Sequence, residues 1–267
     1  MLPPQSPLFW AEHKDRFLRQ LLIRDISELS GRVVIVYYTD CSTLAQIDAN
    51  DDQYVLELIR EIPADQPVDL ILETNGGTTD GTEKLVALLR NINDLRVVVP
   101  RRAKSNGTLL ALAAREIVMG PCSELGPIDP MINVVDGQPV PAQFIVAAAS
   151  AGRELDPVLL ETAKHAIAQT EKLAKSLLEV GMCSGAPEKV KKLVKQLATR
   201  DHYHSHGAVI DAHEAQDLGL NVKFVSYDDE YWNWVWLLRC ALESDAITRG
   251  YAKIFEGARV SNAIRSA

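Results

Sequence analysis

The chain has 267 residues, of which 47% are hydrophobic and 24% are charged, a balance typical of globular proteins. Its formal net charge of −8 argues against nucleic-acid binding as its main role. The four cysteines form no C-x-x-C pair and no apolar run reaches about 18 residues, so we expect no disulfide framework, no thiolate zinc site and no transmembrane segment. Because the first residues lack a secretory pattern, we expect a cytoplasmic protein.

The first half of the chain alternates helical and extended patterns. Apolar residues at helical spacing predict a helix over about 6–29, and the β-branched run 32–38 predicts a buried strand. Further strands are expected at 68–74, 96–99 and 117–119, and further helices after Asn50 and over 82–89 and 108–114. This alternation predicts an α/β fold with a largely parallel sheet and helical crossovers.

The second half is mainly helical. A polar loop is expected at 133–141, helices at about 142–151, 157–180, 186–197 and 214–218, and a strand at 221–225. A basic stretch is interpreted as a solvated helix face, with an acidic partner as the alternative; it comprises Lys189, Lys191, Lys192 and Lys195. The aromatic segment 227–243 predicts a buried helix or a subunit contact, and the weak pattern after about residue 244 predicts a flexible tail.

Two loops of small residues follow strands, and we expect both at the carboxyl edge of the sheet, where α/β proteins bind ligands. The first contains Gly76-Gly77, and the second contains Ser105, which opens an apolar helix. A serine at a helix start can attack a carbonyl while the N–H groups of the Gly-Gly turn and of Asn106 hold the developing oxyanion. The alternative is that Ser105 only caps the helix.

Several short motifs of this chain occur together in a known protein family. They are Gly76-Gly77 after the strand 69–72, the runs 97–100, 103–108 and 116–120, and Leu125-Gly126-Pro127-Ile128-Asp129-Pro130. The segments 6–9, 205–207 and 214–220 are similar as well. Taken together, these motifs resemble the serine dehydrogenase proteinase family, a branch of the Clp-protease-fold serine peptidases related to signal peptide peptidase A. The resemblance covers most of residues 6–225.

The resemblance implies a Clp/crotonase-like spiral of ββα units with added helices, and a serine peptidase acting on protein or peptide substrates as a homo-oligomer. Ser105 matches the family nucleophile, and Gly76, Gly77 and Asn106 match its oxyanion-hole elements. Asn106 stands where the family usually has a small residue, and Asn75 stands where it usually has a proline. We expect no cofactor.

The chain is accordingly divided into three parts. They are an N-terminal helical segment 1–31, a Clp-like peptidase domain 32–226, and a C-terminal aromatic helix and tail 227–267. Three tryptophans in five residues cannot all face one side of a helix, so the segment with Trp232, Trp234 and Trp236 is the candidate self-association contact.

The sequence does not identify which residue would act as the general base. Related Ser-Lys peptidases place a lysine in the region that here ends at Gln143 and contains none, and the Clp-type histidine would fall near Asp129. We interpret Asp129 as a turn residue. The remaining candidates are His206, His202, His204 and Lys164. We favour His206 because it lies in a family-like motif and because an imidazole, with an ordinary pKa of about 6.5, suits base catalysis at neutral pH.

Three other interpretations stay open. On a strand, His202, His204 and His206 would share one face and could hold Zn²⁺, although we expect no metal. A catalytically inactive Clp-fold binding or scaffold protein would account for the missing lysine. An acyl-CoA enzyme of the crotonase type shares the spiral fold, but it needs carboxylates at this edge, where Glu73 is the only candidate.

Overall fold

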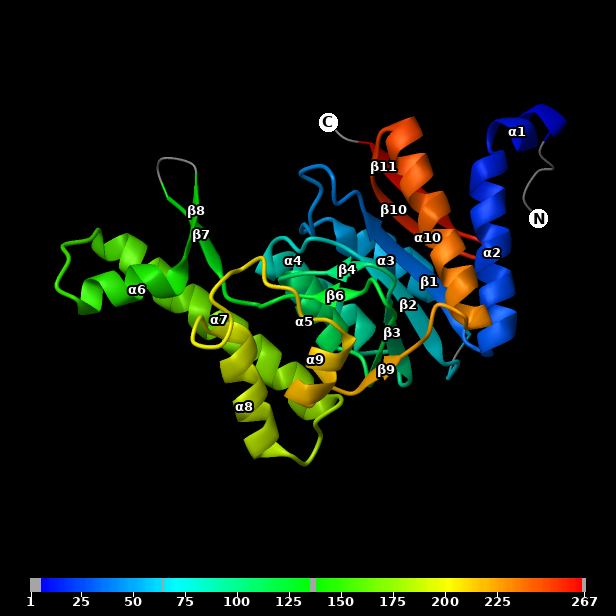
Figure 1. Cartoon of the computed structure of the whole chain (residues 1–267). Helices are drawn as coiled ribbons and strands as arrows, with labels where there is room; N and C mark the ends of the chain where they lie inside the picture. Colours follow the sequence, from blue (N-terminus) through cyan, green and yellow to red (C-terminus); the bar gives the residue numbers. More distant parts are fainter. Residues whose placement is uncertain (1–5, 64, 135–137, 266–267) are drawn as a thin grey trace.

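A seven-stranded sheet forms the centre of the molecule. The computed structural model describes residues 6–63, 65–134 and 138–265, and the sheet has the order β11-β10-β1-β2-β3-β5-β9 (Figure 1). Five neighbouring strands are parallel: β1 (Val33–Thr39), β2 (Val68–Glu73), β3 (Leu95–Val99), β5 (Glu116–Met119) and β9 (Val222–Phe224). The predicted α/β fold with a mostly parallel sheet is therefore confirmed.

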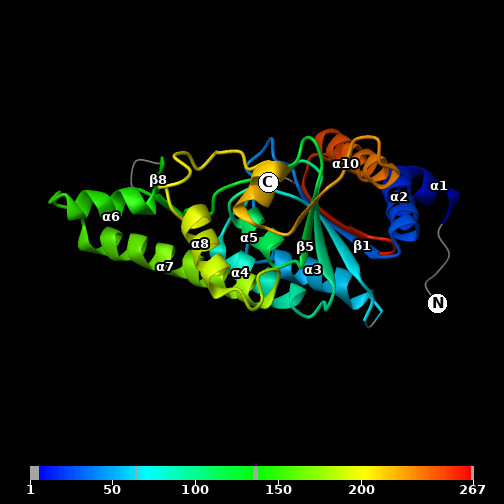
Figure 2. The ribbon, with the colours of Figure 1, turned by 60° about the horizontal axis from the view of Figure 1, so that its bottom comes forward.

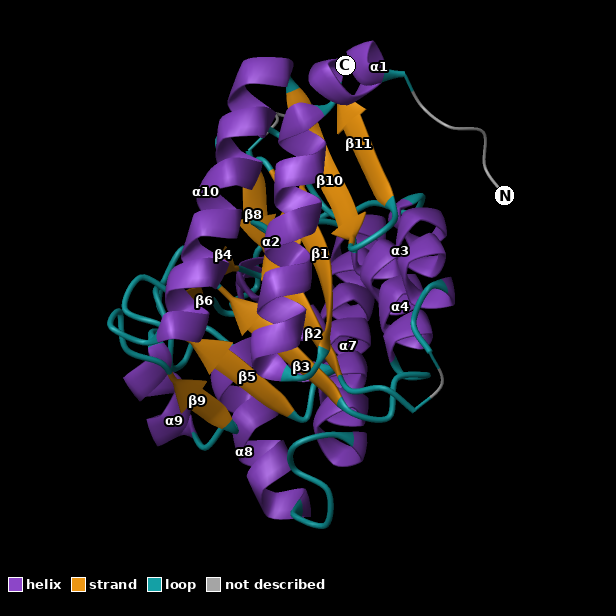
Figure 3. Cartoon of the chain, turned by 90° about the vertical axis from the view of Figure 1, so that its right-hand side faces the viewer, coloured by secondary structure: helices purple, strands orange, loops and turns teal. Residues whose placement is uncertain are grey.

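Helices cover both faces of this sheet. One face carries α2 (Lys14–Ser30) and α10 (Glu230–Arg249), and the other carries α3 (Asp51–Arg60), α4 (Thr79–Leu89) and α5 (Asn106–Leu112) (Figures 2 and 3). Along β1, Val36 packs in the layer with α2 and α10, whereas its neighbour Tyr37 packs in the opposite layer. Burial on both faces explains why the strands are continuous apolar runs in the sequence.

The N-terminal helical segment is divided at His13. A short helix, α1 (Pro7–Glu12), precedes α2, where the sequence predicts one uninterrupted helix. Two ion pairs, Arg19 with Asp245 and Asp15 with Arg249, align α2 antiparallel to α10. The N-terminal segment is thus fixed against the main body of the chain.

The predicted C-terminal tail is wrong, because residues 244–249 complete α10 and strands follow over residues 251–265. These residues form β10 (Tyr251–Gly257) and β11 (Ser261–Arg265), and β10 pairs antiparallel with β1. The strand pattern is obscured by Lys253 and Glu256, two charged residues that are buried in the fold and neutralised by ion pairs. A buried charge requires a partner, and those partners are far away in the sequence.

An arm projects from one end of the sheet (Figures 1 and 2). It consists of β7 (Met131–Asn133), β8 (Pro139–Pro141), α6 (Ala142–Ser150) and the first part of α7 (Pro157–Val180). It has a small apolar core of its own. The loop predicted at 133–141 forms these two strands in part, while 135–137 lie outside the described residues.

Smaller elements complete the described chain. They are β4 (Arg102–Ala103), β6 (Glu124–Leu125), α8 (Pro187–Ala198) and α9 (Ala212–Leu218). Of the helices in the described ranges, none combines the length and the apolar content that crossing a membrane requires.

The three tryptophans of α10 have different environments. Trp232 is buried, and its ring lies on Gly120 at the end of β5. Trp234 and Trp236 are half-buried, and the Trp236 ring lies under the guanidinium of Arg239. Only Trp232 therefore belongs fully to the core.

Replacing Gly120 with alanine is expected to lower the free energy of unfolding by about 1–3 kcal/mol. The added Cβ would lie 2.2 Å from a ring atom of Trp232, so the ring would have to shift. Urea denaturation measures the effect. Gly257→Ala is the matched control, because its Cβ would lie 3.6 Å from its nearest neighbour, a side-chain atom of Leu58. Equal stabilities of Gly120→Ala and the unmodified protein would contradict this packing.

Candidate active site

The two loops singled out in the sequence are joined directly after β2. The Thr74 N–H donates to the Arg102 carbonyl at 3.0 Å, and the Lys104 N–H donates to the Thr74 carbonyl at 3.0 Å. This pairing brings the Gly76-Gly77 turn against the start of α5. A Cβ on Gly76 would lie 2.8 Å from the Lys104 carbonyl oxygen and 2.9 Å from the Ser105 Cβ, and its φ is +103°. Only glycine fits this position without strain.

Ser105 has a backbone conformation that L-residues rarely adopt, with φ 51° and ψ −121°. It immediately precedes α5, yet its side chain makes no capping hydrogen bond. The helix-cap interpretation therefore does not explain a serine here. Strained backbone of this kind concentrates at functional sites.

Two backbone N–H groups next to Ser105 are free to bind an anion. The Gly76 N–H is occupied, because it donates to the Thr74 hydroxyl at 3.1 Å. Within the described residues, neither the Gly77 N–H nor the Asn106 N–H donates to a protein acceptor. The Asn106 side-chain amide donates to the Gly77 carbonyl and ties the turn to the helix start. The larger side chain of Asn106 thus makes a structural hydrogen bond beside the site.

His206 is held by a buried carboxylate. Its Nδ1 lies 2.8 Å from one oxygen of Asp129, and the second Asp129 oxygen accepts a hydrogen bond of 2.7 Å from the Arg200 Nε. Asp129 is only 1% exposed. Among the described residues, no hydrogen-bond partner is found for the His206 Nε2. A histidine whose Nδ1 is fixed by a carboxylate has the arrangement of a general base.

The segment after His206 is attached to the residue before Ser105. The Lys104 ammonium donates to the carbonyls of Gly207 at 3.2 Å and Ala208 at 2.8 Å. The same ammonium pairs with Glu124 at 3.2 Å. Lys104 is therefore committed to joining the segment after His206 to the residue before Ser105, and no hydrogen bond joins Ser105 to His206 themselves among the described residues.

Lys164, the other candidate base, lies on the exposed side of α7. Its ammonium pairs with Glu161 one turn away at 2.7 Å, and about half of its side chain is exposed. A lysine in a surface ion pair lacks the buried surroundings that a lysine base requires. These contacts favour His206 over Lys164.

Gln143 stands in the region where related Ser-Lys peptidases have a lysine base, but it has a structural role here. Its amide nitrogen donates to the Ala198 carbonyl at 2.5 Å, and its amide oxygen accepts from the Arg200 N–H at 3.0 Å. Gln143 thus holds the segment that carries Arg200. Sequence reasoning missed Asp129 and Arg200 as site residues; the only signal was Asp129 within the family-like motif 125–130.

The zinc interpretation is not supported by the backbone. Residues 201–206 form turns rather than a strand, so the three histidines do not alternate on one face. His204 lies with its Nδ1 3.2 Å from the Arg200 carbonyl, and His206 is bonded to Asp129. No group of three or more His, Cys, Asp or Glu side chains suited to a metal ion occurs in the ranges that the structure describes.

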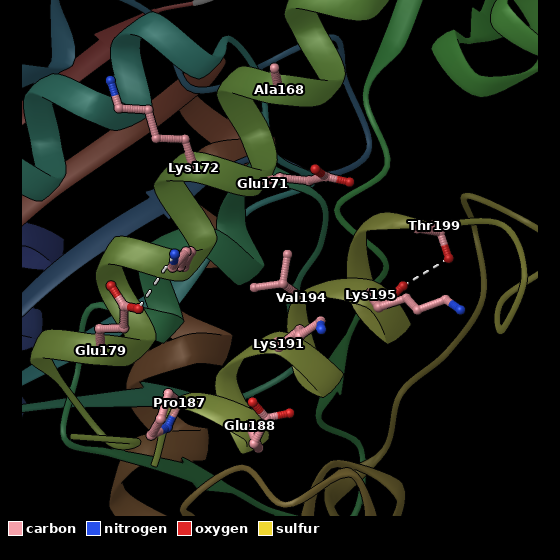
Figure 4. Close-up of a pocket in the computed structure, with 11 residues that line it drawn as sticks. Ala168, Glu171, Lys172, Glu179, Pro187, Glu188, Lys191, Val194, Lys195 and Thr199 are labelled. Atoms are coloured by element: carbon pink, nitrogen blue, oxygen red, sulfur yellow. Dashed lines mark hydrogen bonds and ion pairs between the residues drawn. The ribbon is translucent and has the colours of Figure 1, made fainter. Parts of the chain in front are cut away.

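The basic stretch of α8 borders a separate hollow between α7 and α8 (Figure 4). Lysines and glutamates alternate around it: Lys172, Lys191 and Lys195 stand with Glu171, Glu179 and Glu188. The mixed charge agrees with a solvated helix face and gives no preference for an acidic partner.

Comparison with known proteins gives one family. A sequence profile described as ClpP-like SDH-type serine proteinase matches residues 20–237. Two uncharacterized proteins of Methanocaldococcus jannaschii are 36% identical over 182 residues and 32% identical over 180 residues, in each case 66% of this chain. The chain spans 60% and 59% of the lengths of these relatives.

Solved structures of proteases are similar at low identity. A mutant of the 1510-N membrane-bound stomatin-specific protease in complex with a substrate peptide is 16% identical, with 88% of both chains covered and a TM-score of 0.46. A ClpP1 mutant from Listeria monocytogenes is 19% identical, with 77% of this chain and 98% of that chain covered and a TM-score of 0.44.

The strain at Ser105 predicts an unusual order of stabilities. Ser105→Gly and Ser105→Ala both remove the hydroxyl, but only alanine keeps a Cβ at positive φ. We expect the glycine variant to be the more stable by about 1 kcal/mol. Denaturation midpoints measure the difference. At the exposed helical position Ser244 the order should reverse, with alanine more stable by about 1 kcal/mol. The same order at both positions would contradict the strained conformation.

Proposed function

This chain belongs to the family of ClpP-like SDH-type serine proteinases, and from that premise we propose that it hydrolyses peptide bonds with Ser105 as the nucleophile. One observation carries the proposal. Ser105 has an uncommitted side chain on strained backbone, next to the Asn106 N–H and packed against the turn that carries the Gly77 N–H, and the segment carrying the His206–Asp129 pair is tied to its neighbour Lys104. A nucleophile, two oxyanion donors and a base are the parts that acyl transfer requires.

The chemistry proceeds in two halves. The Ser105 hydroxyl attacks the peptide carbonyl, its proton passes to the His206 Nε2, and the N–H groups of Gly77 and Asn106 stabilise the oxyanion. His206 then returns the proton to the leaving amine as the C–N bond breaks, which leaves an acyl ester on Ser105. Water, deprotonated by His206, attacks the ester and releases the acid and the free serine.

Asp129 and Arg200 act through His206. The Asp129 carboxylate keeps the proton on Nδ1, so that Nε2 presents its lone pair as the base. Arg200 fixes the other oxygen of this buried carboxylate and balances its charge. The order of the proposed triad along the chain is Ser105, Asp129, His206.

The alternatives receive less support. The inactive-scaffold interpretation depends on the lysine missing at Gln143 and on the bulk of Asn106. The His206–Asp129 pair supplies a candidate base, and the Asn106 side chain is bonded to the Gly77 carbonyl. A crotonase-type enzyme would need a free carboxylate, but Glu73 is buried and both its oxygens accept hydrogen bonds of 3.0 Å from Arg239. Burial raises the pKa of Glu73, while its ion pair with Arg239 opposes that rise.

A fluorophosphonate probe tests the triad without a known substrate. We expect stoichiometric labelling of Ser105, detected by mass spectrometry, and none in Ser105→Ala. The labelling rate should fall about 100-fold or more in His206→Ala and also fall in Asp129→Asn. Lys164→Met is the matched control and should label at the unmodified rate. Labelling no faster than that of denatured protein would overturn the proposal and favour the scaffold.

We also propose that the chain self-associates, as expected from the sequence. Apolar side chains stand exposed on the outer surface of α2 and α10, which lie side by side (Figure 3). They are Leu18, Leu21 and Leu29 on α2, and Leu237 and Ile247 on α10.

We also propose a cytoplasmic location, as expected from the sequence. The cysteines in the described chain are free thiols, which supports this proposal.

Light scattering tests the self-association. We expect a mass above that of one chain, and a shift toward the single-chain mass in Leu21→Glu or Leu237→Glu, because a charge in an apolar contact is costly. Val209→Glu is an exposed apolar control on another part of the chain and should leave the mass unchanged. A single-chain mass at every concentration would reject self-association.

A further inference from the structure

The Gly76-Gly77 turn is held on its outer side by a second segment. The Ile47 N–H donates to the Gly76 carbonyl at 2.7 Å, and the Thr78 N–H donates to the Ile47 carbonyl at 2.9 Å. The backbones are so close that a Cβ on Gly77 would lie 2.2 Å from the Ile47 carbonyl oxygen. The position of the Gly77 N–H is therefore set by the position of Ile47.

The segment after Ile47 is fixed in turn by one buried ammonium. The Lys253 Nζ donates to Asp48 at 2.5 Å and to both oxygens of Asp51 at 2.7 and 2.9 Å. The Asp48 N–H also donates to Asp51 at 3.0 Å, and the Tyr37 hydroxyl donates to the same carboxylate at 2.5 Å. Every one of these bonds converges on residues 48–51.

This cluster lies inside the molecule. Lys253 is 5% exposed and Asp51 is fully buried. Burial raises the pKa of Asp51, and the bonds from Lys253 and Tyr37 oppose that rise. If the ammonium were removed, Asp51 would be left as an uncompensated buried charge, and the segment that carries it would have to move or take up a proton.

We propose that Lys253 is a positioning residue for the oxyanion hole. Through Asp48 and Asp51 it fixes Ile47, and through Ile47 it fixes the Gly77 N–H beside Ser105. The inference rests on the proposed peptidase function. Lys253 lies on β10, beyond the residues 20–237 that the family profile matches, so the family motifs do not include it.

The proposal is tested by labelling kinetics over a range of fluorophosphonate concentrations. In Lys253→Met we expect the maximum labelling rate to fall about 10- to 100-fold, because a displaced donor no longer stabilises the developing oxyanion. The probe concentration giving half of that rate should stay unchanged, because the substitution does not touch the probe-binding surface. If Lys253 had a role in stability alone, its loss would not lower the maximum labelling rate while leaving the half-rate probe concentration unchanged.

Arg19→Met is the matched control. Arg19 is also buried and also pairs with a buried carboxylate, Glu256 of β10, but it makes no described contact with residues 47–51. Measured below both melting temperatures, Arg19→Met should label at the unmodified rate. If Lys253→Met fails to fold, Asp48→Asn tests the positioning role instead. The Asp48 side chain is 45% exposed, and loss of its charge leaves the Lys253–Asp51 pair intact. We expect a smaller fall in the same direction.

The outcomes separate this inference from the proposed function. Normal labelling of Ser105 in folded Lys253→Met, or in Asp48→Asn where the first variant fails, would overturn the positioning role and leave the peptidase proposal standing. An equal fall in Arg19→Met would also overturn it, because the effect would then be general destabilisation. Absence of labelling in the unmodified protein would instead overturn the peptidase function itself.

Discussion

The close approach between the end of β2 and the start of α5 is the constraint on which the site depends. The backbone pairing of Thr74 with residues 102–104 brings two loops, about 30 residues apart in sequence, to within contact distance of one another. Space for a side chain is lost at Gly76, and Ser105 takes a strained conformation. From this one contact follow the position of the serine hydroxyl, the orientation of the helix start and the proximity of the Gly77 and Asn106 N–H groups.

Buried ion pairs fix the layers around this contact. Asp69 on β2 accepts hydrogen bonds from Arg32 and Arg96, and Glu73 at the end of the same strand pairs with Arg239 of α10. Such pairs contribute little net stability, because desolvation offsets their attraction, but breaking one leaves a buried charge. The Asp69 pairs join β2 to β3 and to the residue before β1, and the Glu73–Arg239 pair fixes α10 on β2. The Lys253 cluster follows the same principle beside the oxyanion turn.

Much of this organisation can be predicted from the sequence. The main features that could not be predicted depend on contacts between residues far apart in the chain. The five parallel strands and most helices before residue 226 follow from apolar periodicity, and Ser105 with Gly76-Gly77 follows from small-residue loops after strands. β10 is hidden because Lys253 and Glu256 interrupt its apolar pattern, and their charges make sense only with partners more than 200 residues away. Asp129 reads as a turn residue for the same reason, since its bond to His206 joins positions 77 residues apart.

In the proposed function, Ser105, the two free N–H groups and His206 form one acyl-transfer site. A crystal structure of the chain with a phosphonate probe bound covalently to Ser105 tests it most directly. We expect the phosphonyl oxygen to lie about 2.7–3.1 Å from both the Gly77 and Asn106 nitrogens, with the His206 Nε2 turned toward the Ser105 Oγ. An adduct whose oxygen points to solvent while both N–H groups remain unoccupied would contradict it.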